Sequence, residues 1–216
     1  MSVSPGAKGE ITVHEPTPAQ RTVARRTAEA RATIPDIELS LDIEVSERDG
    51  SWDARLVSAC ARALRAVPRA NGAYRDGHFE TYSRVNVGFV VAHGDAYLIP
   101  TVFDADQLSV AQLTDELDRL TQGARERTLL APAFSGATFT LFNAGALGVA
   151  RSGIVINPPQ AGALACGAVR DVPVLRGGEV VAGRVMTATL ACDHRVLYGA
   201  AAAEFLAAFT RALTGA

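Results

Sequence analysis

The stretch TLACDHRVLYGAAAAEFL, residues 189–206, holds the change of pattern on which the fold prediction rests. A run of mostly apolar residues stops at Asp193-His194-Arg195, and an alanine-rich helical pattern resumes after Gly199. A histidine at a strand end, between charged residues and close to a glycine turn, is both exposed and held in place. A general base that works near neutral pH needs these two properties. His194 is therefore the candidate catalytic residue, and on spacing alone a purely structural histidine remains the alternative.

Strand and helix patterns surround this stretch in the C-terminal half. TFTLFN (138–143) is rich in β-branched and aromatic residues, and SGIVINPP (152–159) and EVVAGRVMTATLAC (179–192) supply further predicted strands. Gly145 and Gly148 lie in the turn AGALG and lack the flanking pattern of a phosphate-binding loop. The last predicted helix spans about 200–213 and gathers on one face Phe205, Leu206, Phe209 and Leu213.

The N-terminal half begins with a polar segment, residues 1–16, that prolines and glycines interrupt, and we expect a flexible arm there. A helix is predicted from about 17 to 32, a strand over 37–45, a turn at Asp49-Gly50 and a helix over 51–67. One or two strands are expected within 78–94 and another within 96–103. Ser109 and Gln112 form a capping-box pattern before a helix with the stripe Leu113, Leu117 and Leu120. Interleaved in this way, the elements predict an α/β fold: a two-layer sandwich with a mixed β-sheet flanked by helices.

Composition narrows the functional classes. Of the 216 residues, 48% are hydrophobic, and no apolar run reaches the roughly 18 residues of a membrane helix. The formal net charge of -2 and the absence of a basic block make nucleic acid or an anionic membrane an unexpected partner. Three cysteines do not make a disulfide framework, and we expect a cytoplasmic protein. Histidine and cysteine spacings typical of metal sites are missing, so no metal is predicted.

Several motifs together resemble one known family. The segments FTLFNAG (139–145), INPPQ (156–160) and DHRVLYG (193–199) are similar to signatures of the catalytic domain of the 2-oxoacid dehydrogenase dihydrolipoamide acyltransferases. Four more segments fall in that family's order and spacing, namely QRTVARR (20–26), VPRANGAY (67–74), VNVGFVVA (85–92) and LIPTVFDAD (98–106). The resemblance implies the fold of chloramphenicol acetyltransferase, and residues 17–216 are expected to form an acyltransferase catalytic domain without lipoyl or subunit-binding domains.

The resemblance also implies a chemistry. In this family a histidine, matched by His194, takes a proton from an attacking thiol or hydroxyl, which then attacks a thioester. The acyl donor is expected to be acetyl-CoA. Members of the family are trimers whose active site is a channel between two subunits, so a homotrimer is expected here.

Two positions depart from the family pattern. The family's oxyanion-binding serine is replaced by Phe142, and the aspartate four residues after the histidine is replaced by Tyr198. Substitute hydrogen-bond donors are Thr140, Asn143, Tyr198 or a backbone amide. Phe142 is a candidate for binding the substrate, and both replacements are also compatible with ordinary packing. Cys192 precedes Asp193 in the last strand and is read as an inert packing residue.

These departures lead to three functional hypotheses. The first is an acetyl-CoA-dependent O-acyltransferase acting on a hydroxyl of a small molecule, such as a tetronate or polyketide intermediate, with a partner enzyme that eliminates the acetate. The second is a catalytically inactive trimer that serves as a scaffold. The third is a lipoamide acyltransferase that uses a lipoyl domain carried by another chain.

Overall fold

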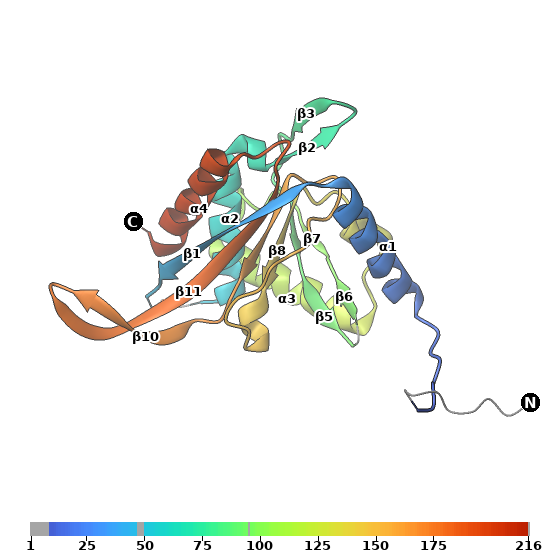
Figure 1. Cartoon of the computed structure of the whole chain (residues 1–216), viewed down its shortest axis with the longest axis horizontal. Helices are drawn as coiled ribbons and strands as arrows, with labels where there is room; N and C mark the ends of the chain where they lie inside the picture. Colours follow the sequence, from blue (N-terminus) through green and yellow to red (C-terminus); the bar gives the residue numbers. More distant parts are fainter. Residues whose placement is uncertain (1–8, 47–49, 95, 216) are drawn as a thin grey trace, which may run out of the picture.

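A seven-stranded mixed sheet is the centre of the computed structural model, which describes residues 9–46, 50–94 and 96–215 (Figure 1). Six strands lie in the order β1-β11-β9-β8-β4-β7, and β10 pairs with the free part of β11. Their bounds are β1 Asp36–Glu44, β4 Val87–Phe89, β7 Thr101–Val102, β8 Phe139–Asn143, β9 Gly162–Cys166, β10 Arg170–Arg176 and β11 Glu179–Asp193. The pairs β4/β8 and β8/β9 are parallel and the remaining pairs are antiparallel. The predicted mixed sheet is confirmed.

Three helices cover one face of this sheet: α2 Trp52–Ala66, α3 Val110–Glu126 and α4 Gly199–Thr214 (Figure 1). Their buried side chains join those of the sheet in one hydrophobic core. The stripes predicted for α3 and α4 are buried in this core. Helix α1, Pro18–Thr33, lies apart from these three, beside β6, and begins with a capping box formed by Thr17 and Gln20. The two layers predicted from the sequence are therefore present.

The other face of the sheet carries no helix from the α2–α4 layer. Alternation along β8 turns Phe139 and Leu141 into the core, so Thr140 and Phe142 lie on this open face. Across the strands the open-face row of Phe142 continues through Ala165 and Thr189. In this row Ala165 and Thr189 are buried and Phe142 is half-buried, so the term open face means only that helices α2, α3 and α4 do not cover it.

Two hairpins complete the fold. The first pairs β2 Gly72–Arg75 with β3 His78–Thr81, and the second pairs β5 Val91–His93 with β6 Ala96–Leu98. Short 3-10 turns occupy Pro68–Ala70 (η1), Ala131–Phe134 (η2) and Ala144–Leu147 (η3). The β10–β11 hairpin projects from the body of the molecule around Gly177-Gly178, two residues with positive φ that suit a tight hairpin turn (Figure 1).

Three local expectations differ from the structure. Residues 78–94 hold three strands where one or two were expected. Residues 96–103 hold two strands instead of one, because Pro100 lacks a backbone N–H and interrupts the pairing between β6 and β7. The predicted strand 152–159 is wrong: this segment is a loop. Ile154 and Ile156 in this loop pack on Ile34 and Ala191, so their apolar character reflects loop packing and not sheet pairing.

Part of the N-terminal prediction falls outside the described residues. Residues 1–8 of the expected arm and Asp49 of the expected turn belong to the segments that are not described. Residues 10–17 are exposed and contain neither helix nor strand. Among the described residues, no helix has the length and apolar character needed to span a membrane.

Candidate functional site

His194 lies in a tight turn between β11 and α4. Its backbone N–H donates to the carbonyl oxygen of Pro35 at 3.0 Å, which ties the turn to the start of β1. Asp193, only 1% exposed, accepts the backbone N–H of Arg195 and pairs with the Arg195 guanidinium, with an Nη2 to Oδ2 distance of 2.7 Å. The His194 side chain is exposed. The backbone is therefore fixed on both sides while the imidazole remains accessible, as predicted for a general base.

Tyr198 contacts the imidazole directly. The two rings meet edge to face, with centroids 5.6 Å apart and an interplanar angle of 88°. The Tyr198 hydroxyl is 3.4 Å from the carbonyl oxygen of Arg195, which is long for a hydrogen bond between oxygens. Tyr198 is 47% exposed, so it is not a core residue.

Thr140 and Asn143 already have hydrogen-bond partners within the chain. The Thr140 hydroxyl donates to Gln160 Oε1 at 2.7 Å in a buried position. The Asn143 amide donates to Asp53 Oδ1 at 2.5 Å, and its oxygen accepts the Ala146 N–H at 3.3 Å. Asn143 also alternates with Phe142 and so lies on the helix-covered face of the sheet. Both side chains hold local structure.

Phe142 is remote from His194 within one chain. Its row on β11 is that of Thr189, five residues before His194. Five residues of extended strand span about 16 Å. A single protomer therefore does not bring Phe142 and His194 to the same reacting centre.

A pocket of about 600 Å³ opens at the end of the sheet that carries His194. The pocket is lined by one side of α1, by β6, and by residues 134–137 and 155–160. Arg26 is the charged side chain among these described lining residues, and it donates to Asn157 Oδ1 at 3.2 Å. Gln160 in the wall is followed by Ala161, whose carbonyl oxygen accepts the Asp193 N–H. The volume suits a small organic ligand.

All three cysteine thiols are buried, which disfavours the nucleophilic thiolate. Cys192 is buried, and its thiol faces the carbonyl oxygen of Leu197 at 3.5 Å. Burial, with the nearby Asp193 carboxylate as a smaller cause, raises the pKa of this thiol to about 12. Burial also raises the pKa of the Cys60 and Cys166 thiols. In the described part of the chain, no group of three or more histidine, cysteine or acidic residues is arranged to hold a metal ion.

The fold and these motifs define the catalytic domain of an acyltransferase family. The sequence profile of the 2-oxoacid dehydrogenases acyltransferase catalytic domain matches residues 46–216, and the chain belongs to this family. The acetyltransferase component of the pyruvate dehydrogenase complex of Rhizobium meliloti is 35% identical over 212 residues, which cover 89% of this chain and 47% of that protein. A mitochondrial counterpart from Arabidopsis thaliana is 33% identical, with 89% and 40% covered. The chain spans about half the length of the curated relatives it matches.

Solved structures agree with this assignment. The dihydrolipoamide acetyltransferase of Azotobacter vinelandii is 26% identical and superposes with a TM-score of 0.92, covering 99% of this chain and 97% of that chain. Studies of its catalytic mechanism concern a serine, a histidine 52 residues later and an asparagine four residues after the histidine. Chloramphenicol acetyltransferase, 12% identical with a TM-score of 0.56 over 88% of this chain and 94% of that chain, shares the fold.

Proposed function

We propose that this domain transfers an acyl group between coenzyme A and an acceptor thiol or hydroxyl, with His194 as the general base. The observation that carries the proposal is the fixed turn that presents an exposed imidazole in a chain of this family. His194 follows Phe142 by 52 residues and precedes Tyr198 by four. These spacings equal those of the serine, histidine and asparagine studied in the Azotobacter enzyme.

The reaction follows from the properties of the imidazole. Its unprotonated nitrogen removes the proton from the acceptor S–H or O–H, and the sulfur or oxygen attacks the thioester carbonyl carbon. The tetrahedral intermediate collapses with departure of the coenzyme A thiolate, which takes the proton back from the imidazolium. The intermediate's oxyanion receives no hydrogen bond from Phe142, because a phenyl ring has no donor. Rate is therefore expected to be lower than with a serine at this position.

The acceptor that the relatives favour is a dihydrolipoyl thiol. The relatives named above are dihydrolipoamide or dihydrolipoyllysine acetyltransferases. The pocket beside residues 155–160 supports this reading, since its lining is largely apolar and it lies next to the His194 turn. Acetyl-CoA is then the thioester partner.

Transfer to a hydroxyl of a small molecule is the second candidate function. Phe142 favours it, because this residue replaces a hydroxyl with an aromatic surface on the open face and thereby changes what the site accepts. A tetronate or polyketide intermediate, with a partner enzyme that eliminates the acetate, is the specific form of this candidate. The relatives support the lipoyl acceptor more directly than this form.

A homotrimer is part of the proposal. Within one chain Phe142 and His194 are separated by the length of five strand residues. A site that uses both positions therefore needs the open face of one copy and the His194 turn of another. The inactive-scaffold alternative gives no reason for a hydrogen-bonded turn that exposes the His194 ring.

The test is coenzyme A release from acetyl-CoA, with dihydrolipoamide or a panel of alcohols as acceptor. We expect acceptor-dependent release with dihydrolipoamide, and we expect His194→Ala to lower it by at least about 100-fold. His14→Ala, which removes an exposed histidine ahead of α1, is the matched control and leaves the rate unchanged. Release only with alcohols establishes O-acyl transfer. No release with any acceptor, from folded trimers, supports the scaffold.

A further inference from the structure

Arg69 lies between the aromatic rings of two separate elements. Its guanidinium carbon is 5.3 Å from the ring centroid of Phe79 in β3 and 5.8 Å from that of Tyr198. Both rings are exposed, at 51% and 47%. In the part of the chain that is described, no carboxylate forms an ion pair with Arg69. The guanidinium is therefore held by the negative faces of the two rings.

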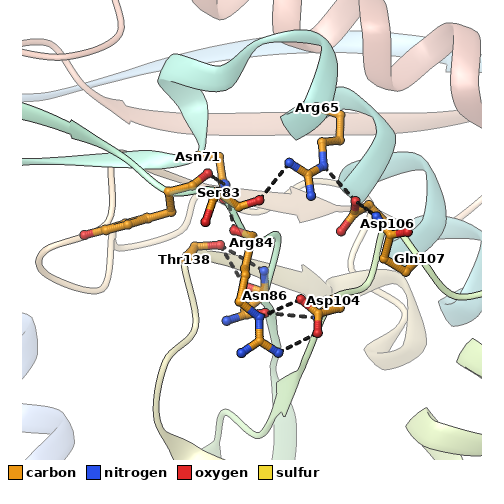
Figure 2. Close-up of polar contacts among 10 residues, drawn as sticks. Arg65, Asn71, Ser83, Arg84, Asn86, Asp104, Asp106, Gln107 and Thr138 are labelled. Atoms are coloured by element: carbon orange, nitrogen blue, oxygen red, sulfur yellow. Dashed lines mark hydrogen bonds and ion pairs between the residues drawn. The ribbon is translucent and has the colours of Figure 1, made fainter.

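The backbone that carries Arg69 is firmly held. Asn71, only 2% exposed, follows Arg69 by two residues, and its side-chain amide donates to the carbonyl oxygens of Tyr82 and Arg84, each at 2.9 Å (Figure 2). Arg65 adds a bond to the carbonyl oxygen of Ser83 at 2.8 Å (Figure 2). These bonds close the base of the β2–β3 hairpin beside η1. Arg69 is thus presented from a rigid support.

The β2–β3 hairpin also contacts the His194 turn through Arg195, in addition to the contact through Arg69. The Arg195 guanidinium lies 4.6 Å from the Tyr74 ring centroid while it pairs with Asp193. The backbone repeats this link, since the Ala161 N–H donates to the carbonyl oxygen of Gly72 and the Ala161 carbonyl oxygen accepts the Asp193 N–H. Arg69, Tyr198 and the His194 turn therefore share one support.

We propose that Arg69 is a positioning residue that acts on His194 through Tyr198. Arg69 holds the face of the Tyr198 ring, and the Tyr198 ring packs at right angles to the imidazole, which limits its rotation. The hydroxyl of Tyr198 makes only a long contact, so the ring itself does the positioning. This inference rests on the proposed role of His194 as the base.

The geometry explains how the chain functions with a tyrosine at this position. A cation can hold Tyr198 through the negative face of its ring. Arg69 supplies that cation from an element 129 residues away in the sequence. Small displacements of a catalytic base matter, since a misplacement of about 1 Å costs up to about 100-fold in rate.

The test is a double-mutant cycle in kcat, measured on the assembled protein in the coenzyme A release assay. Arg69→Met is expected to lower kcat about 10-fold and to leave the KM for acetyl-CoA and acceptor within about 2-fold. Tyr198→Ala is expected to lower kcat at least as much, and Arg69→Met is expected to add nothing in the Tyr198→Ala background. The conservative variants are expected to retain most of the wild-type kcat, because Arg69→Lys keeps a cation and Tyr198→Phe keeps the ring. Arg211→Met is the matched control, since Arg211 lies about 18 Å along α4 from Gly199, where the helix begins.

A second readout is independent of turnover. The ring current of Tyr198 shifts the imidazole C–H resonances of His194, which His194→Ala identifies in the NMR spectrum. Arg69→Met is expected to move these resonances towards their positions in Tyr198→Ala, and Arg69→Lys is expected to leave them nearly unmoved. Equal losses from Arg69→Met in both backgrounds, a raised KM, or unmoved resonances would overturn the proposal. If wild type and His194→Ala have the same activity, the proposed function fails instead, and the resonance shifts still decide the role of Arg69.

Discussion

Phe142 is the residue whose replacement says most about the reaction. Phe142 lies in β8 at the spacing from His194 that the serine has in the Azotobacter enzyme, and it is half-buried on the open face. At this position an aromatic ring stands in place of a hydroxyl. One oxyanion-hole donor is worth about 100- to 1000-fold in rate. If the oxyanion forms beside Phe142, the absence of a hydrogen-bond donor on its ring lowers the rate of acyl transfer.

Phe142→Ser is predicted to raise kcat with dihydrolipoamide by about 10-fold or more, because it supplies the missing donor. Coenzyme A release measures the change, and Phe142→Ala serves as the control that removes the ring without adding a hydroxyl. A similar rise in both variants would show that space alone matters. A loss in Phe142→Ser with alcohol acceptors would show that the ring binds the acceptor.

Single residues also show how far the sequence reaches into the site. His194 was predicted from its place at a strand end, and the structure gives it the exposed ring and fixed backbone that this pattern indicates. Thr140 and Asn143 are close to Phe142 in sequence, yet alternation and local bonds direct their donors to Gln160 and Asp53. Arg69 left no signal in the sequence, since its contact with Tyr198 joins positions that only the folded chain brings together.

At the scale of elements, the helices were predictable because their signals are local. The capping box marks the start of α3 at Ser109, and the apolar face places α4 within one residue of the expected 200–213. The pattern of 152–159 did not reveal a loop, since its isoleucines pack on Ile34, which caps the end of α1, and on Ala191 of β11, and not on paired strands of the sheet. Pro158 and Pro159 lack the N–H donors that a sheet ladder needs, and this feature was the available warning.

Ser109 provides an element-scale prediction. Its hydroxyl accepts the Gln112 N–H at 3.3 Å while the Gln112 side chain accepts the Ser109 N–H at 2.9 Å. Ser109→Ala is predicted to lower the free energy of unfolding by about 1 kcal/mol, because the first turn of α3 loses its cap. Urea denaturation measures the change. Ser152→Ala removes a hydroxyl that bonds only the neighbouring Gly153 carbonyl, and we expect it to change stability by less than about 0.5 kcal/mol. Equal losses in both variants would contradict the capping role.

At the scale of the whole molecule, the proposed homotrimer sets the Phe142 side of the sheet in one copy against the His194 turn of another. Phe142 lies at the centre of that face, and the pocket lies at the end of the sheet beside the turn. Because one chain keeps Phe142 and His194 apart, we propose that each site in a closed trimer takes its base from one copy and its Phe142 surface from the next. This proposed arrangement predicts that activity requires the oligomer and that two defective chains complement each other.

Complementation between variants tests this arrangement. Phe142→Lys places a charge at the proposed reacting centre and His194→Ala removes the base, so each variant alone is predicted to be inactive. When the two are refolded together in equal amounts, one interface in four pairs an intact face with an intact histidine, and about a quarter of the wild-type rate is expected. Native mass spectrometry confirms that the trimers are mixed. Mixed trimers as inactive as their parents would place the whole site within one chain, and the geometry of β8 and β11 would then have no role in catalysis.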